Sequence, residues 1–473
     1  MEFFNTNLPT IAWFIYLFSA FLFIQGLRLM NSPRTARKGN FVSIAGMSIA
    51  FALALFESSY KGFELTSAAI VLIAGIAIGA AFGFVTAKKV KMTAMPQLVS
   101  IFNTVGGGAA ALVAINDALN GGAHQEVYVF ITIILGIIIG SVTFTGSLIA
   151  AGKLQGIVSG SPIKVPLKKL IDLICIAGII FCSYMLISGN YFGYGIEMPV
   201  ILLTALSLIM GITFVLPIGG ADMPVVISIL NACTGTAVAM AGFVINNLIM
   251  IVAGALVGAA GGILSKLMAE AMNRSLFNIL AGGFGDTGEV SADGGAALNL
   301  VETSADDVAV QMAYAARVII VPGYGLAVAG AQHEIADLTK ILEGKGVEVI
   351  FAIHPVAGRM PGHMNVLLAE ANVSYEKLIP LEDVNPMFST ADVALVVGAN
   401  DVTNPAARRQ GTPISGMPIL DVDAAKNVVV VKRGRGKGYA GIENELYGLP
   451  HTKMLYGDAK KAVASIISAI KEL

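Results

Sequence analysis

Nine apolar stretches, each about 17–25 residues long, dominate the first 270 residues of this chain and constrain its fold more than any other feature. About 20 helical residues, rising 1.5 Å each, are needed to cross the apolar core of a bilayer. Each stretch is therefore predicted to be a membrane-spanning helix. The stretches cover residues 10–30, 39–56, 66–87, 97–116, 127–150, 169–188, 198–217, 221–242 and 244–267.

The distribution of charge divides the chain into two parts. Residues 1–270 contain 22 charged side chains (13 Lys and Arg, 9 Asp and Glu), whereas residues 271–473 contain 39 (17 and 22). We therefore expect a membrane domain over 1–270, a Gly- and Ala-rich linker over 271–298, and a water-soluble domain over 299–473. The net charge of −1 argues against a nucleic-acid partner bound by bulk charge.

Basic residues in alternate loops predict the orientation of the spans. The loops after the first, third, fifth and ninth spans, together with the span ends beside them, contain Arg28, Arg34, Arg37, Lys38, Lys88, Lys89, Lys91, Lys153, Lys164, Lys168, Lys169, Lys266 and Arg274. The opposite loops contain one basic residue, Lys61. By the positive-inside rule, the N-terminus is expected outside and the soluble domain in the cytoplasm. An odd number of spans agrees, because it places the two termini on opposite sides.

A strand–turn–helix pattern begins at Arg317, with an apolar strand that ends before Gly323 and a helical pattern that continues to Lys340. The turn reads Gly323-x-Gly325-x-x-Val328, which matches the dinucleotide-binding fingerprint except at its last position. The first glycine permits a tight turn, and the second lets backbone N–H groups approach a pyrophosphate. The alternative is a strand–turn–helix unit that binds no ligand.

Further apolar strands alternate with helical patterns, which predicts an α/β fold with a doubly wound, Rossmann-like parallel sheet. The expected strands are 347–354, 391–398, 417–422 and 427–432, and the expected helices include 364–371 and 458–473. Ligands of such sheets bind beyond the carboxyl ends of the strands. We therefore expect the site in the loops 354–362, 398–401 and 432–439.

The charges in these loops indicate which dinucleotide binds. An NAD site usually places an acidic residue at the end of the second strand, but the strand that ends at His354 has none there. A glycine-rich loop instead contains Lys432, Arg433, Arg435 and Lys437. Because a 2′-phosphate requires cationic donors, the pattern favours NADP(H). The alternative is a solvated basic loop.

Three polar residues lie in or beside the apolar stretches and are candidates for a proton path. Asp222 begins the eighth stretch, Asn231 follows about two and a half turns later, and Asn103 lies in the fourth. The alternatives are helix capping for Asp222 and interhelical hydrogen bonds for the asparagines. Small residues at 253–262 are expected to serve close helix packing. The three cysteines lack the spacing of a metal site, and no metal is expected.

Longer motifs resemble a known family, the β subunit of the proton-translocating (Re/Si-specific) NAD(P) transhydrogenase. In the apolar part they are Met95-Pro96, Gly140-x-Val-Thr-Phe-Thr-Gly-Ser147, Gly219-Gly-Ala-Asp-Met-Pro-Val225 and Ala271-Met-Asn-Arg-Ser275. In the soluble part they are Pro322–Ala329, His354–Asn365, Gly398–Asp401, Asn404-Pro-Ala406 and Gly438-Tyr-Ala-Gly441. The resemblance covers essentially the whole chain.

The resemblance implies an NADP(H) site in the soluble domain. The implied binding residues are Gly323, Tyr324, Gly325, Ala327, Val328, Ala329, Val356, Gly358, Arg359, Gly398, Asn400, Asp401, Lys432, Arg433, Tyr439, Ala440 and Gly441. Lys432 and Arg433 are implied to meet the 2′-phosphate, Tyr439 to belong to a loop that closes over the nucleotide, and Asp401 to be a coupling acid.

The resemblance also implies partners and a location. An α subunit, of one or more chains, is expected to supply an NAD(H)-binding domain and further membrane helices, in a dimer of αβ units within a bacterial inner membrane. Hydride is expected to pass directly between two nicotinamides, with no catalytic side chain, metal or flavin. Some members have a membrane histidine where this chain has Asn103, so a partner helix is expected to supply one. The alternative function is an ion channel or transporter regulated by a cytoplasmic nucleotide-binding domain.

Overall fold

The structure, a computed structural model, describes residues 2–473 except 31, 61–66, 91, 121–126, 160–161, 164, 220–221, 273–274, 277–278, 280–299, 360–361, 413, 435–437 and 439. It divides into two compact units. Most of residues 1–263 form the membrane unit, and residues 264–473, with short stretches at 160–162 and 218–226, form the other. Most of the predicted linker 271–298 lies outside the described residues.

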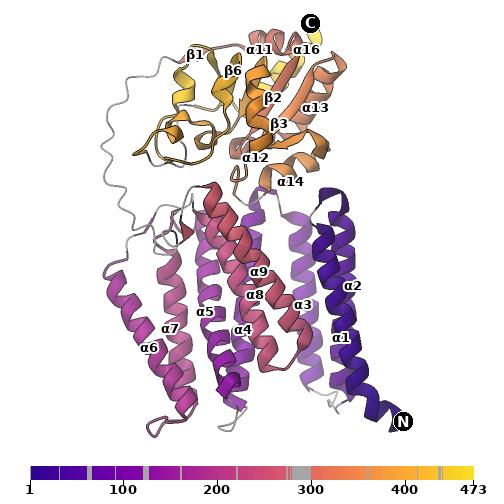
Figure 1. The fold of residues 1–473 in the computed structure, drawn as a ribbon, viewed down its shortest axis with the longest axis vertical. Helices are drawn as coiled ribbons and strands as arrows, with labels where there is room; N and C mark the ends of the chain where they lie inside the picture. Colours follow the sequence, from indigo (N-terminus) through magenta and orange to yellow (C-terminus); the bar gives the residue numbers. More distant parts are fainter. Residues whose placement is uncertain are drawn as a thin grey trace. The chain divides into compact units, whose positions relative to one another are not determined.

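Nine long apolar helices form the described part of the N-terminal region, as expected (Figure 1). They are α1 (Glu2–Met30), α2 (Pro33–Tyr60), α3 (Ser67–Lys89), α4 (Met95–Asn120), α5 (Val127–Gln155), α6 (Lys168–Ser188), α7 (Glu197–Val215), α8 (Met223–Val244) and α9 (Leu248–Ala271). Each predicted apolar stretch coincides with one of these helices, and each helix is long and apolar enough to cross a membrane.

Glycines allow these helices to pack backbone against backbone. A Cβ atom on Gly107 of α4 would lie 3.0 Å from the Gly140 carbonyl oxygen of α5. A Cβ atom on Gly235 of α8 would lie 2.5 Å from the Gly258 nitrogen of α9. Such contacts are typical of membrane helices. Because lipid tails are themselves apolar, the hydrophobic effect does not drive the helices together, and close packing must stabilise their association. The packing role expected for residues 253–262 is thus seen at Gly258.

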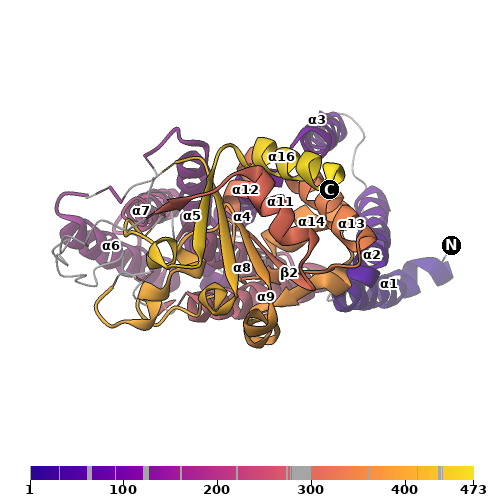
Figure 2. The same ribbon diagram turned by 90° about the horizontal axis from the view of Figure 1, so that it is seen from above.

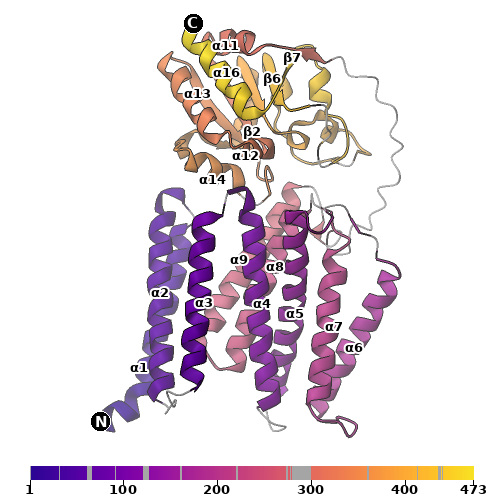
Figure 3. The ribbon, with the colours of Figure 1, turned by 180° about the vertical axis from the view of Figure 1, so that it is seen from behind.

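Helix α3 (Figure 3) differs from its neighbours because its most apolar window buries none of its residues against the described part of the chain. A Cβ atom added at Gly75, Gly79 or Gly83 would meet nothing within 4 Å. The surface of α3 is therefore left to lipid or to another chain.

The second unit contains a seven-stranded sheet in which every neighbouring pair is parallel. The strands are β1 (Val301–Glu302), β2 (Arg317–Pro322), β3 (Glu348–Ile353), β4 (Leu378–Pro380), β5 (Val393–Val397), β6 (Asn427–Lys432) and β7 (Thr452–Tyr456). Their order is β4-β3-β2-β5-β6-β7-β1. Apart from the short edge strand β1, this is the 3-2-1-4-5-6 order of the dinucleotide-binding fold, so the predicted fold class is confirmed.

Both faces of the sheet are covered. Helices α11 (Ala305–Ala313), α13 (Gln332–Gly344) and α16 (Ala459–Glu472) gather on one side of it (Figure 2). The core on the other side includes Val384 of the short helix α15 (Leu381–Val384), Phe388 of η3 (Asn385–Thr390) and Val422 of η6 (Val422–Ala424). Because both faces are buried, β5 consists of five consecutive buried apolar residues.

Two local predictions were wrong. Residues 417–422 form no strand, because Pro418 has no N–H to donate and the Leu420 N–H donates to the Val402 carbonyl instead of to a strand. The helix expected from the fingerprint to Lys340 is broken at Gly330, whose φ of 62° is left-handed, into α12 (Tyr324–Ala329) and α13. Strands β1, β4 and β7 were not predicted, and they are only two, three and five residues long.

Glycine contacts give a matched test of helix packing. We expect Gly235→Ala to lower the stability of the detergent-solubilised chain by roughly 1–3 kcal/mol, because the added methyl group would overlap the backbone of α9. Gly75→Ala is the control: it meets open space and raises helix propensity, so its melting temperature should be unchanged or higher. Equal melting temperatures for the two variants would contradict this account.

Candidate nucleotide-binding site

The candidate site lies at the carboxyl ends of the neighbouring strands β2 and β5. These strands are neighbours in the sheet, and the chain leaves them toward opposite edges, so a crevice opens beyond their carboxyl ends. The Gly323 N–H donates to the Val397 carbonyl, and the Gly325 N–H donates to the Gly398 carbonyl, both at 2.9 Å. Two loops that are about 75 residues apart in sequence are thereby joined by backbone hydrogen bonds.

Only glycine permits this contact. A Cβ atom on Gly323 would lie 2.3 Å from the Gly398 carbonyl oxygen, and one on Gly325 would lie 2.7 Å from the Gly398 Cα. Gly398 has a left-handed φ of 69°, and its own Cβ would lie 2.4 Å from the Leu326 nitrogen. From the sequence pattern, the backbone at Gly325 is expected to lie close to a pyrophosphate. In the structure, the Gly325 N–H instead donates a hydrogen bond to the Gly398 carbonyl.

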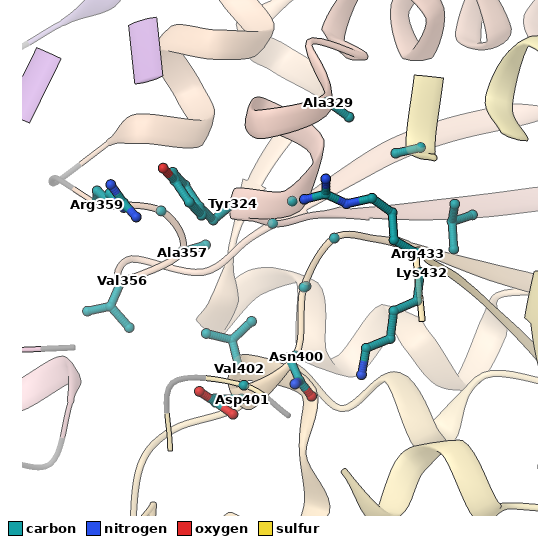
Figure 4. A pocket seen from close by; sticks show the side chains of 18 of the residues that line it. Tyr324, Ala329, Val356, Ala357, Arg359, Asn400, Asp401, Val402, Lys432 and Arg433 are labelled. Atoms are coloured by element: carbon teal, nitrogen blue, oxygen red, sulfur yellow. The ribbon is translucent and has the colours of Figure 1, made fainter. Parts of the chain in front are cut away.

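A pocket opens at this crevice, and most of the predicted binding residues line it (Figure 4). Those that do are Gly323, Tyr324, Gly325, Ala329, Val356, Gly358, Arg359, Gly398, Asn400, Asp401, Lys432 and Arg433. Ala327 is buried inside α12, and Val328 is 45% exposed; neither lines the pocket, nor do Ala440 and Gly441. Tyr439, Arg435 and Lys437 lie outside the described residues.

One wall of the pocket combines a cation and an aromatic ring. The Arg359 guanidinium lies 4.4 Å from the centroid of the Tyr324 ring, a cation–π contact between the loop after β3 and the first residue of α12. Figure 4 shows both side chains on one side of the pocket. This wall presents a positive, planar surface beside the glycine turn.

The opposite wall is formed by the carboxyl end of β6. Lys432 is the last residue of that strand, half-buried, with its Nζ 4.7 Å from the centroid of the Tyr447 ring. Burial lowers the pKa of the Lys432 ammonium, and the negative charges of Asp401 and Glu443 oppose this shift. Arg433 follows and is exposed. Two adjacent cations therefore meet at this wall, one held in place and the other reaching into solvent.

A network of amides and a carboxylate forms the floor. The Tyr447 hydroxyl donates to Asn400 Oδ1 at 3.0 Å, and Asn444 Nδ2 donates to the Asn400 carbonyl at 3.0 Å. Asp401 Oδ2 accepts the Ala440 N–H at 3.0 Å. Asp401 thus holds the segment that adjoins Tyr439 to the end of β5. Tyr447 and Asn444 were not predicted, since only their tertiary contacts bring them here.

The two walls are far apart. Between the ends of β3 and β6 lie β2 and β5, so the separation is three strand intervals, about 14 Å at about 4.8 Å each. Figure 4 shows Arg359 and Lys432 on opposite sides of the pocket. The arrangement therefore suits an elongated ligand with anionic groups along its length.

The proton-path candidates lie in or beside membrane helices. Asn103 is buried, and its Nδ2 donates to the Ile227 backbone carbonyl of α8 at 3.4 Å. The backbone carbonyl of Asn103 accepts a hydrogen bond from the Thr234 hydroxyl, also at 3.4 Å. These contacts fit the interhelical alternative for Asn103. Asn231 occupies α8 one turn from each of these partners. Asp222 directly precedes α8, and its carbonyl accepts the Val225 and Val226 N–H groups, as a capping residue does.

Comparison with known proteins bears on the whole chain. The family model described as NAD(P) transhydrogenase beta subunit matches residues 12–469. Two proteins named NAD(P) transhydrogenase subunit beta, from Rhodospirillum rubrum and from a named strain of that species, are each 47% identical over 471 residues. These alignments cover 96% of this chain and 98% of each relative.

A buried histidine gives the site a pH-dependent stability. His354 follows β3, and its Nε2 lies 2.7 Å from the Pro418 carbonyl. Burial lowers the pKa of His354 to about 4. Between that value and about 6.5 the unfolded chain binds the extra proton, so stability present above pH 6.5 is lost as the pH falls toward 4, by roughly 3 kcal/mol.

Hydrogen exchange of β2 and β3 peptides in the full chain, at pH 7 and pH 4.5, measures this loss. His354→Gln keeps a donor for the Pro418 carbonyl and removes the titrating group. We expect its pH-dependent loss to be clearly smaller than that of the unchanged chain, while carboxylate titrations affect both equally. Identical pH dependence would show that His354 is not the group responsible.

Proposed function

Since the chain belongs to the NAD(P) transhydrogenase beta subunit family, we propose that its pocket binds NADP(H) and that the Lys432–Arg433 pair binds the 2′-phosphate. Its activity is that of the β subunit of a transhydrogenase, which moves hydride between NAD(H) and NADP(H) and couples this to proton translocation. The observation that carries the cofactor assignment is the position of the cations. A solvated basic loop is the weaker alternative, because Lys432 is half-buried against Tyr447.

The residues of the pocket fit this cofactor. The glycine contact keeps side chains out of the centre of the crevice, so a pyrophosphate can approach the start of α12. Lys432 and Arg433 offer charge-assisted hydrogen bonds to a phosphate. When bound, the nicotinamide of NADP(H) supplies the hydride chemistry. The residues of this chain bind and orient the nucleotide, and no side chain is assigned to proton transfer in that step.

The position of the cations also assigns a direction to the nucleotide. In most dinucleotide sites of this fold the adenosine ribose lies at the end of the second strand, which here is β3. The end of β3 bears no acid, and the cations are at β6, on the other side of the β2–β5 crevice. The adenosine half is therefore assigned to the β6 side and the nicotinamide half to the side of Arg359 and Tyr324.

Coupling to the membrane requires partners and a second state. The family implies an α subunit, and we assign to it the NAD(H) domain and further membrane helices, in a dimer of αβ units. Asp222, Asn231 and Asn103 are assigned to the proton path, with the N-terminus outside, the α/β domain in the cytoplasm and the chain in a bacterial inner membrane. Protonation there biases the α/β domain between an occluded state that reacts with NADH and an open state that exchanges NADP(H).

The basic pair is tested by removing its charge. Replacing Lys432 and Arg433 by Ala should weaken NADP(H) binding by about 100-fold or more, because two charge-assisted hydrogen bonds are lost, and should leave weak NAD(H) binding almost unchanged. Lys345→Ala with Lys471→Ala removes the same charge from exposed positions away from the pocket and is the control. Calorimetry on the full chain gives both affinities. Equal losses for the two nucleotides would refute the assignment.

The membrane assignment has its own test. In vesicles that contain the αβ complex, Asp222→Asn should reduce proton-coupled turnover at least tenfold while the NADP(H) affinity stays the same, because a path residue acts on transport and not on binding. Glu270→Gln, which neutralises a carboxylate that is 59% exposed near the end of α9, is the control. Unimpaired proton pumping by the Asp222 variant would remove this residue from the path.

A further inference from the structure

His363 is a buried imidazole beside the nucleotide pocket to which neither the sequence motifs nor the proposed mechanism gives a role. It is the first residue of α14 (His363–Glu370) and is fully buried. Its Nδ1 accepts the backbone N–H of Arg359 at 3.1 Å. A single side chain thus holds the backbone of the residue whose guanidinium forms one wall of the pocket.

The loop is built closely around this ring. Gly358 has a φ of 106°, and a Cβ atom there would lie 2.6 Å from both Cβ and Nδ1 of His363. Only a residue without a side chain can bring the chain this near to the imidazole. The contact fixes the position of Arg359, the next residue along.

The hydrogen bond also defines the tautomer. Burial, and then the positive charge of Arg359, lower the pKa of His363, so the ring is neutral near pH 7. Because Nδ1 accepts the Arg359 N–H, the ring proton is on Nε2. Nε2 is buried and has no hydrogen-bond partner among the residues that the structure describes. Among the described residues, the ring therefore forms its hydrogen bond through Nδ1, which faces the loop.

The effect of the ring extends to the glycine turn through Arg359. The guanidinium of Arg359 lies over the Tyr324 ring, and the Tyr324 and His363 rings lie 6.1 Å apart, tilted by 56°. His363 thus contacts the backbone of Arg359, in the loop after β3, and lies beside the ring of Tyr324, at the start of α12. A shift of the Arg359 backbone would separate the guanidinium from Tyr324.

We propose that His363, as the Nε2–H tautomer, is a positioning residue that holds Arg359 against Tyr324 through its Nδ1 and so shapes the half of the pocket that lies away from Lys432. The inference rests on the proposed NADP(H) site. It predicts that His363 affects binding of the whole dinucleotide and has no effect on binding of its adenosine 2′-phosphate end.

Two amide substitutions distinguish the roles of the two ring nitrogens of His363. In His363→Asn the side-chain Oδ1 can take the place of Nδ1 and accept the Arg359 N–H, whereas in His363→Gln the amide reaches only the position of Nε2. With the full chain in detergent, we expect the Asn variant to bind NADP(H) within about threefold of the unchanged chain. The Gln variant should bind it about tenfold more weakly, since the Arg359 N–H loses its acceptor and the Arg359 guanidinium is then no longer held against Tyr324. Binding of 2′-AMP should be the same in all three.

A double-mutant cycle with Arg359→Ala provides the second measurement. If His363 acts through Arg359, adding His363→Gln to Arg359→Ala should cause no further loss of NADP(H) affinity. Additive losses, equal NADP(H) affinities for the Asn and Gln variants, or a parallel loss of 2′-AMP binding would each overturn the proposal. If the unchanged chain bound neither 2′-AMP nor NADP(H), the proposed function would fail instead.

Discussion

The site depends on one contact, the backbone-to-backbone approach of the Gly323–Gly325 turn and Gly398. Hydrogen bonds of 2.9 Å join these loops, and any side chain at the three glycines would overlap backbone atoms. The approach lets the β2 and β5 loops meet while leaving the crevice above them free of side chains. The two walls of the pocket are then placed by the strands on either side, β3 and β6.

The sheet determines how far apart the walls are and what lies between them. Arg359 lies in the loop after β3 and Lys432 ends β6, and the spacing of parallel strands separates the ends of β3 and β6 by about 14 Å. This separation suits the extended dinucleotide that we propose as the ligand, with its phosphorylated adenosine end assigned to β6. The cations at the two ends are held differently: burial against Tyr447 restrains Lys432, whereas Arg359 is held by a neighbouring ring and through its own backbone N–H.

The membrane unit follows different rules because its surroundings are apolar. Glycines bring α4 against α5 and α8 against α9, and Asn103 adds a polar contact to α8. Helix α3 buries nothing against the described part of this chain. A proton that crosses about 150–200 mV carries about 3.5–4.6 kcal/mol, at about 2.3 kcal/mol per 100 mV, which could shift a hydride equilibrium by more than a factor of 100.

Patterns local in sequence were enough to predict the nine spans, the parallel sheet and most of the pocket. Length and apolarity define a membrane helix, and the Gly323–Gly325 turn after an apolar strand indicates where a ligand binds, because these properties depend on near neighbours in the chain. The same reasoning mistook 417–422 for a strand, since hydropathy cannot show that Leu420 bonds to Val402. The roles of Tyr447, Asn444 and His363 emerged only from the tertiary structure. Their contacts join residues through space. The burial that sets the charge of a histidine, and the hydrogen bond that sets its tautomer, exist only once the chain has folded.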